Sequence, residues 1–157
     1  MGDWNRSSRE IQPEKMHPEI AAAIQAHVET YELGSILEDV VMCIETRSER
    51  KASRLLGIGG EQWMLSTVLV TSAWLIIAGM GEKQGAFANS VQRGKAQVAD
   101  YAEGYAYRLV PDRGLVVTGA FTGRVGLDGS EHTSIFIPLG EGPLTGRFMA
   151  LLIQDKQ

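Results

Sequence analysis

The chain has 157 residues, with 15 Lys and Arg against 19 Asp and Glu, a formal net charge of −4 and a hydrophobic fraction of 44%. This length fits one domain, and the hydrophobic fraction is enough for a packed core, which excludes wholesale disorder. The acidic balance argues against a dedicated nucleic-acid-binding protein. Cys43 is the single cysteine, which excludes an internal disulfide and cysteine-rich metal sites. We expect a cytoplasmic protein.

The domain organisation that we predict has three parts. They are a flexible tail over residues 1–16, an N-terminal helix over residues 17–34 and one β-rich domain over residues 36–157. Residues 1–12 are polar, as mobile termini usually are, and Trp4 is the one side chain in them that is suited to docking.

The N-terminal helix has a clear beginning and end. Pro18 followed by Glu19 is typical of the first turn of a helix, because proline lacks only an amide that is unpaired there anyway. Apolar residues then recur at helical spacing as far as Gly34, and glycine commonly ends a helix. We predict a helix over about residues 18–32.

An uncharged stretch, residues 62–81, has the length that a membrane-spanning helix needs. However, serine and threonine interrupt it, and its β-branched residues favour strands. We therefore prefer two buried strands, Trp63–Val70 and Trp74–Gly79, which turn at Thr71–Ser72, over a transmembrane helix.

Further strands are predicted on either side of this pair. The apolar run Val40–Ile44 indicates a buried strand, and residues 45–51 its solvated end and a loop. Residues 86–104 show no settled period, and we expect short strands there. The alternation within residues 105–121 predicts a β-hairpin that turns at Pro111–Gly114.

The last elements are a strand, Thr133–Leu139, and a helix that begins near Pro143. The helix has one apolar stripe, which needs a sheet to cover: Leu144, Phe148, Leu151 and Leu152. Strands that follow one another without alternating helices argue against a parallel α/β sheet. We predict an α+β fold: a bent antiparallel sheet or partly open β-barrel of about six to seven strands, capped by the C-terminal helix, with an extra N-terminal helix.

Three segments resemble, in order and pattern, the elements of a known domain family. They are similar to its opening strand (Glu38–Arg47), a hairpin (Thr67–Ile76) and its capping helix (Pro143–Ile153). In this the chain resembles the bacterial pleckstrin-homology-like domains over about residues 36–153. The resemblance implies a barrel closed by its last helix, and it leaves the N-terminal helix as an addition. None of the three segments carries a catalytic signature.

Motifs for chemistry are absent from the sequence. It has no phosphate-binding loop, dinucleotide fingerprint, nucleophile elbow or paired metal-ligand spacing. His17, His27 and His132 are far apart, and we expect packing or surface roles for them. Cys43 lies among apolar neighbours, where burial keeps a thiol neutral, so we expect a core residue and no nucleophile. We predict no enzymatic activity, no catalytic residue, no cofactor and no metal.

One cluster of charge stands out, with two glutamates interspersed: Arg47, Arg50, Lys51 and Arg54. The family resemblance implies an anion-binding or lipid-binding site at these four residues. A solvated loop with internal salt bridges is the interpretation that we prefer. For the aromatic residues of the strand patterns we expect core or cross-strand packing before a binding role: Trp63, Trp74, Tyr101, Tyr105 and Tyr107.

The leading hypothesis for function is a non-catalytic binding module for a protein partner. The partner is either a different protein or another copy of the chain, in a homo-oligomer, and we expect no binding to nucleic acid. The first alternative is peripheral binding to anionic membrane lipid through the four basic residues. The second is a small-molecule-binding barrel, or an enzyme with an unfamiliar site inside the sheet.

Overall fold

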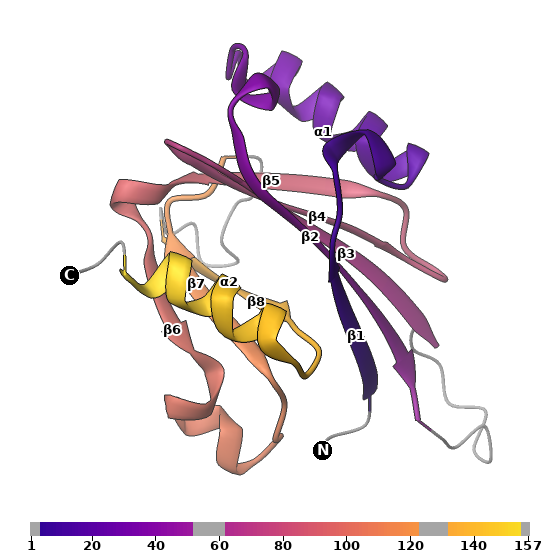
Figure 1. Cartoon of the computed structure of the whole chain (residues 1–157), viewed down its shortest axis with the longest axis vertical. Helices are drawn as coiled ribbons and strands as arrows, with labels where there is room; N and C mark the ends of the chain where they lie inside the picture. Colours follow the sequence, from indigo (N-terminus) through magenta and orange to yellow (C-terminus); the bar gives the residue numbers. More distant parts are fainter. Residues whose placement is uncertain (1–3, 52–61, 123–131, 155–157) are drawn as a thin grey trace.

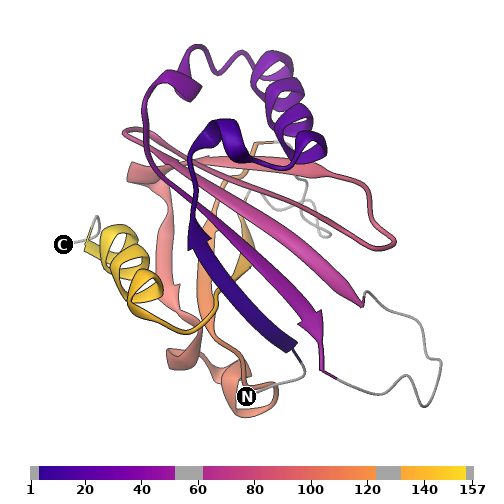
Figure 2. The same ribbon diagram turned by 45° about the vertical axis from the view of Figure 1, so that its right-hand side comes forward.

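The computed structural model describes residues 4–51, 62–122 and 132–154. Its strands form two antiparallel sheets that pack face to face, so the fold is α+β as predicted, but the strands do not close into a barrel. One helix covers the outer face of the larger sheet, and the other helix lies on the opposite side of that sheet, beside the smaller one (Figures 1 and 2). In the described part of the chain, no helix is long and apolar enough to cross a membrane.

The larger sheet has five strands in chain order: β1 (Trp4–Glu10), β2 (Val40–Arg50), β3 (Trp63–Thr71), β4 (Trp74–Gly81) and β5 (Phe87–Gln92). The predicted pair of buried strands is confirmed as β3 and β4, and the uncharged stretch is therefore no helix. The turn between them is held by Thr71, whose Oγ1 accepts a hydrogen bond from the Trp74 amide at 2.9 Å.

Strand β1 corrects the prediction of a mobile tail, which is wrong for residues 4–10. It pairs along its whole length with β2, including the residues after Ile44 that we expected to form a solvated end and a loop. The cross-strand contacts are polar, such as Ser8 to Thr46 at 2.6 Å and Arg9 to Glu45 at 2.8 Å. A strand held by polar partners lacks the apolar alternation that makes a strand recognisable in a sequence.

The smaller sheet has the order β6 (Gln97–Asp100), β7 (Gly114–Gly119) and β8 (Thr133–Pro138). The short strands expected within residues 86–104 are confirmed as β5 and β6, and the strand expected over Thr133–Leu139 as β8.

The hairpin predicted over residues 105–121 is wrong in its first half. Strand β7 pairs with β6, and between them lie two short 3-10 helices, η5 (Tyr101–Glu103) and η6 (Tyr105–Arg108). Hydrogen bonds between residues three apart, such as Leu109 N to Ala106 O at 3.0 Å, satisfy this backbone without a partner strand.

The outer face of the larger sheet is covered by helix α1 (Pro18–Thr30), which confirms the predicted N-terminal helix. Ile20 and Ile24 are fully buried against alternate residues of the sheet, among them Leu69 and Ile76. The residues between these, such as Val68, point to the opposite face, as the period of two in a strand requires.

The inner core lies between the two sheets and is completed by helix α2 (Pro143–Gln154). Phe148 and Leu152 are fully buried there, which confirms the predicted apolar stripe. Helix α2 contacts β1 of one sheet and β6 of the other, so it covers the side on which these two strands lie (Figure 1).

We expect Phe148→Ala to lower the free energy of unfolding by about 3–5 kcal/mol, because it removes a large side chain from the inner core and leaves a cavity. Urea denaturation followed by tryptophan fluorescence measures the change. Arg147→Ala, at an exposed position of the same helix, is the matched control and should change stability by less than about 0.5 kcal/mol. Equal losses in the two variants would contradict the placement of α2.

His27 sits in the interface between α1 and the larger sheet. Its side chain is buried, and its Nε2 lies 2.8 Å from the Ser90 hydroxyl of β5. Burial lowers the pKa of His27 from its usual 6.5, because a charged imidazolium loses its hydration there.

We expect stability to fall with acid through this histidine. Since the unfolded chain takes up the proton near pH 6.5 and the folded chain only at its lowered pKa, stability is unaffected above about pH 6.5 and declines as the pH drops through the folded pKa. Urea denaturation at pH 7.5 and 5.0 measures the decline. His27→Gln keeps a polar partner for Ser90 and should lose less unfolding free energy between pH 7.5 and 5.0 than the wild type. An equal loss in both proteins would show that groups other than His27 cause the acid sensitivity.

Candidate functional site

The basic residues that the sequence singled out are divided among different parts of the surface. Arg47 and Arg50 line a hollow of about 680 Å³, whereas Lys51 lines a second hollow of about 390 Å³. Arg54 lies outside the described residues. Of the other three, Arg47 and Arg50 belong to strand β2 and Lys51 follows it.

The first hollow, which we name the outer hollow, lies beside the start of α1 at the ends of β2 and β3. Its lining is His17, Arg47, Glu49, Arg50, Gln62, Trp63, Leu65 and Glu82. The half-buried Trp63 and the buried Leu65 belong to the apolar cluster under α1 and supply an apolar part of the wall. Two arginines and two glutamates balance one another, so the hollow does not concentrate positive charge.

Arg50 already has a partner inside the protein. Its guanidinium lies 4.5 Å from the centre of the Trp4 ring, and Arg6 lies 5.4 Å from the same ring. Cation–π contacts of this kind occupy Arg50 and fix the beginning of β1. Trp4 therefore docks, as the sequence suggested, but as part of a strand.

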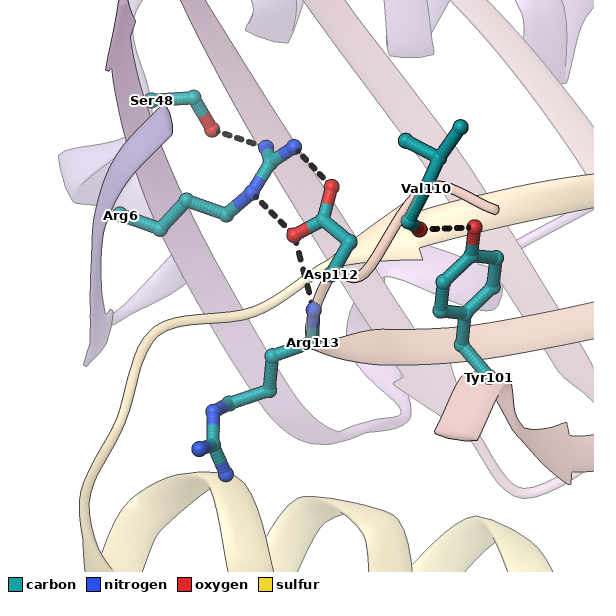
Figure 3. A network of polar contacts seen from close by, with 6 residues as sticks. All are labelled: Arg6, Ser48, Tyr101, Val110, Asp112 and Arg113. Carbon is teal, nitrogen blue, oxygen red and sulfur yellow. Dashed lines mark hydrogen bonds and ion pairs between the residues drawn. The ribbon is translucent and has the colours of Figure 1, made fainter. Parts of the chain in front are cut away.

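A network of polar contacts fastens β1 to the smaller sheet (Figure 3). Arg6 donates two hydrogen bonds to Asp112, from Nε at 3.0 Å and from Nη2 at 2.7 Å, and a third from Nη1 to the Ser48 hydroxyl at 2.6 Å. The side chains of Arg6 and Asp112 are 10% and 17% exposed. Because a guanidinium matches a carboxylate in a two-pronged pair, this contact fixes both distance and orientation.

The second hollow borders this network, and one of its lining residues, Gly140, lies against the backbone of β1. A Cβ atom on Gly140 would lie 2.9 Å from the carbonyl oxygen of Arg6 and from the Cα atom of Ser7, so only glycine fits without a shift. The Gly140 amide also donates to the Ser8 hydroxyl at 2.8 Å. These contacts give Arg6 and Ser8 of β1 structural roles.

The connection between β6 and β7 carries the most exposed apolar side chains in the part of the chain that the structure describes. Tyr105, Leu109 and Val110 are 78%, 72% and 61% exposed. We name residues 104–110 the tip. Tyr105 was expected to pack in the core or across strands, and that prediction is wrong, because the expected strand is the 3-10 helix η6.

The backbone of the tip makes hydrogen bonds within the tip and to Tyr101. The Tyr101 hydroxyl donates to the Val110 carbonyl oxygen at 2.7 Å, as Figure 3 shows, and the Tyr101 ring packs at 4.9 Å from that of Phe136 in β8. The amides of Tyr107 and Leu109 donate to carbonyl oxygens within the tip itself. The exposure of its apolar side chains is therefore built into the fold.

Groups able to perform chemistry are few among the described residues. Cys43 is buried under α1, as expected, and burial, followed by the charges of nearby glutamates, raises the pKa of its thiol to about 12. His27 has the packing role that the sequence suggested, and the His17 side chain accepts a hydrogen bond from the Glu19 amide at the start of α1. Within residues 4–51, 62–122 and 132–154, no three His, Cys, Asp or Glu side chains are placed to hold a metal ion.

Comparison with known proteins adds nothing to this picture: no family model, no curated protein and no solved structure matches the chain.

We expect Asp112→Ala to lower the free energy of unfolding by about 1.5–3 kcal/mol, because Arg6 loses two charge-assisted hydrogen bonds while it stays buried. In a double-mutant cycle, the double variant Arg6→Ala/Asp112→Ala should lose less unfolding free energy than the two single variants lose together. Glu141→Ala is the matched control, since its pair with Arg113 is exposed and surface pairs contribute about 0–1 kcal/mol. Urea denaturation measures all four variants, and additive losses would contradict the coupling.

Proposed function

We propose that this protein is a non-catalytic binding module that recognises a protein partner through the tip. The observation that carries the proposal is the exposure of Tyr105, Leu109 and Val110, three large apolar side chains within six residues. Apolar side chains clustered in this way mark interaction surfaces, because leaving them in water is unfavourable until a partner covers them.

The fixed backbone of the tip supports the same function. Binding to an ordered segment does not incur the entropic cost of ordering it, so more of the free energy gained by burying apolar surface contributes to affinity. Tyrosine and arginine are also enriched at the energetic centres of protein interfaces, and the tip carries Tyr105 beside Arg108.

The two alternatives receive less support. For anionic lipid, Arg47 stands in a hollow with Glu49 and Glu82, and Arg50 packs on Trp4. For a small-molecule-binding barrel, the space between the sheets is occupied by buried side chains such as Leu115. The resemblance to pleckstrin-homology-like domains over residues 36–153 stays a prediction.

The test compares capture of proteins from a lysate of the source cell by three forms of the immobilised full chain. We expect the wild type to retain a discrete set of proteins and the triple variant Tyr105→Ser/Leu109→Ser/Val110→Ser to lose it. Val41→Ser is the matched control, because Val41 is also an exposed apolar residue but lies in β2, outside the tip, and it should retain the set.

Circular dichroism and the urea midpoint check that the triple variant is folded. Retention of the same proteins by the folded triple variant, or failure of the wild type to retain any, would refute the proposal.

A further inference from the structure

A third hollow lies where the start of β4, the end of β5 and the segment after β7 meet. We name it the side hollow, and its volume is about 300 Å³. Its lining includes Trp74, Val91, Lys95, Ala120, Thr122 and His132. It shares no lining residue with the tip or the outer hollow, so the ligand that it takes is a separate question from the proposed function.

Hydrogen bonds hold the wall of the side hollow together without a ligand. The Thr122 amide donates to the Ser90 carbonyl oxygen at 2.7 Å, and the Ser90 amide donates to the Thr122 carbonyl oxygen at 3.2 Å, which joins β5 to the segment after β7. The short 3-10 helix η4 (Arg93–Lys95) carries Lys95 and is tied to the turn between β3 and β4. There the Arg93 amide donates to the Ala73 carbonyl oxygen at 2.8 Å, and Arg93 Nη1 donates to the Thr71 carbonyl oxygen at 2.6 Å.

The side hollow combines an apolar wall with a basic group. Val91 is 1% exposed and Trp74 is half-buried, and both belong to the lining. Lys95 is exposed, and in the described part of the chain its ammonium group contacts no carboxylate. None of the described lining residues is acidic. A ligand that matches this surface therefore has an apolar body and a negative charge.

We propose that the side hollow binds a small organic acid with one carboxylate on an apolar body. The body covers Trp74 and Val91, and the carboxylate pairs with Lys95. An inorganic anion leaves the apolar wall in water, and a neutral apolar molecule leaves Lys95 without a partner. Ligand pockets span about 300–1,000 Å³, so the side hollow is at the small end and fits a single aromatic ring or a short acyl chain.

Benzoate is the probe for this site, and an amide-detected NMR titration of the full chain measures its binding. We expect benzoate to shift the amide signals of Lys95, Ala120 and Thr122. Two matched compounds should bind more weakly, because acetate keeps the carboxylate without the ring and benzamide keeps the ring without the charge.

Variants separate the contributions of the charge and of the apolar wall. Lys95→Gln should weaken benzoate binding about fivefold, the effect of one ion pair at the surface, and leave benzamide binding unchanged. Lys15→Gln, at another exposed lysine outside the lining, is the matched control and should bind benzoate as the wild type does. Ala120→Phe places a ring in the side hollow from an exposed position and should abolish binding of both compounds.

Three outcomes would overturn the inference: acetate binding as tightly as benzoate, equal affinity of Lys95→Gln and the wild type for benzoate, or no benzoate-induced shift at the side hollow. The amide spectrum of each variant without ligand shows that it is folded. Because no tip residue is changed, these outcomes leave the test of the proposed function independent.

Discussion

Strands β2, β3 and β4 of the larger sheet carry apolar residues on both faces, and the need to cover both faces places the two long helices and the smaller sheet. Val68 and Leu69 are neighbours in β3, yet they belong to opposite cores, because successive residues of a strand point to opposite sides. Helix α1 covers one face, while the smaller sheet and α2 cover the other. The apolar side of α1 is buried against the larger sheet, and that of α2 against the core between the two sheets, so both helices depend on this packing for their stability.

The surfaces available for binding arise where this covering is incomplete. Helix α1 packs on β4 and β5, and the outer hollow lies next to it, at the end of β2 and the beginning of β3. The connection from β6 to β7 is longer than a tight hairpin needs, and it forms the tip, fastened by Tyr101 to Phe136 and Val110. At the same end, the pair of Arg6 and Asp112 links β1 of the larger sheet to the segment that leads from the tip into β7.

Sequence reasoning identified the elements whose signals are local. Both long helices begin at a proline, and the β3–β4 pair has its own alternation and turn. Strand β1 was missed because its partners, such as Thr46, are distant in the chain and polar, and the tip was mistaken for a strand because Tyr105, Tyr107 and Leu109 alternate. The predicted basic cluster was close in sequence, but Arg50 turned out to pack on Trp4, a contact that no local pattern could reveal.

The position of Cys43 has a practical consequence. Its thiol lies in the layer between α1 and the larger sheet, so a bulky maleimide reaches the sulfur only after the helix has lifted away. The rate at which Cys43 is labelled in native buffer therefore reports how often the layer between α1 and the larger sheet opens, and no probe has to be engineered into the chain. Because the chain has no other cysteine, the thiol adduct in an intact-mass spectrum is assigned to Cys43 alone.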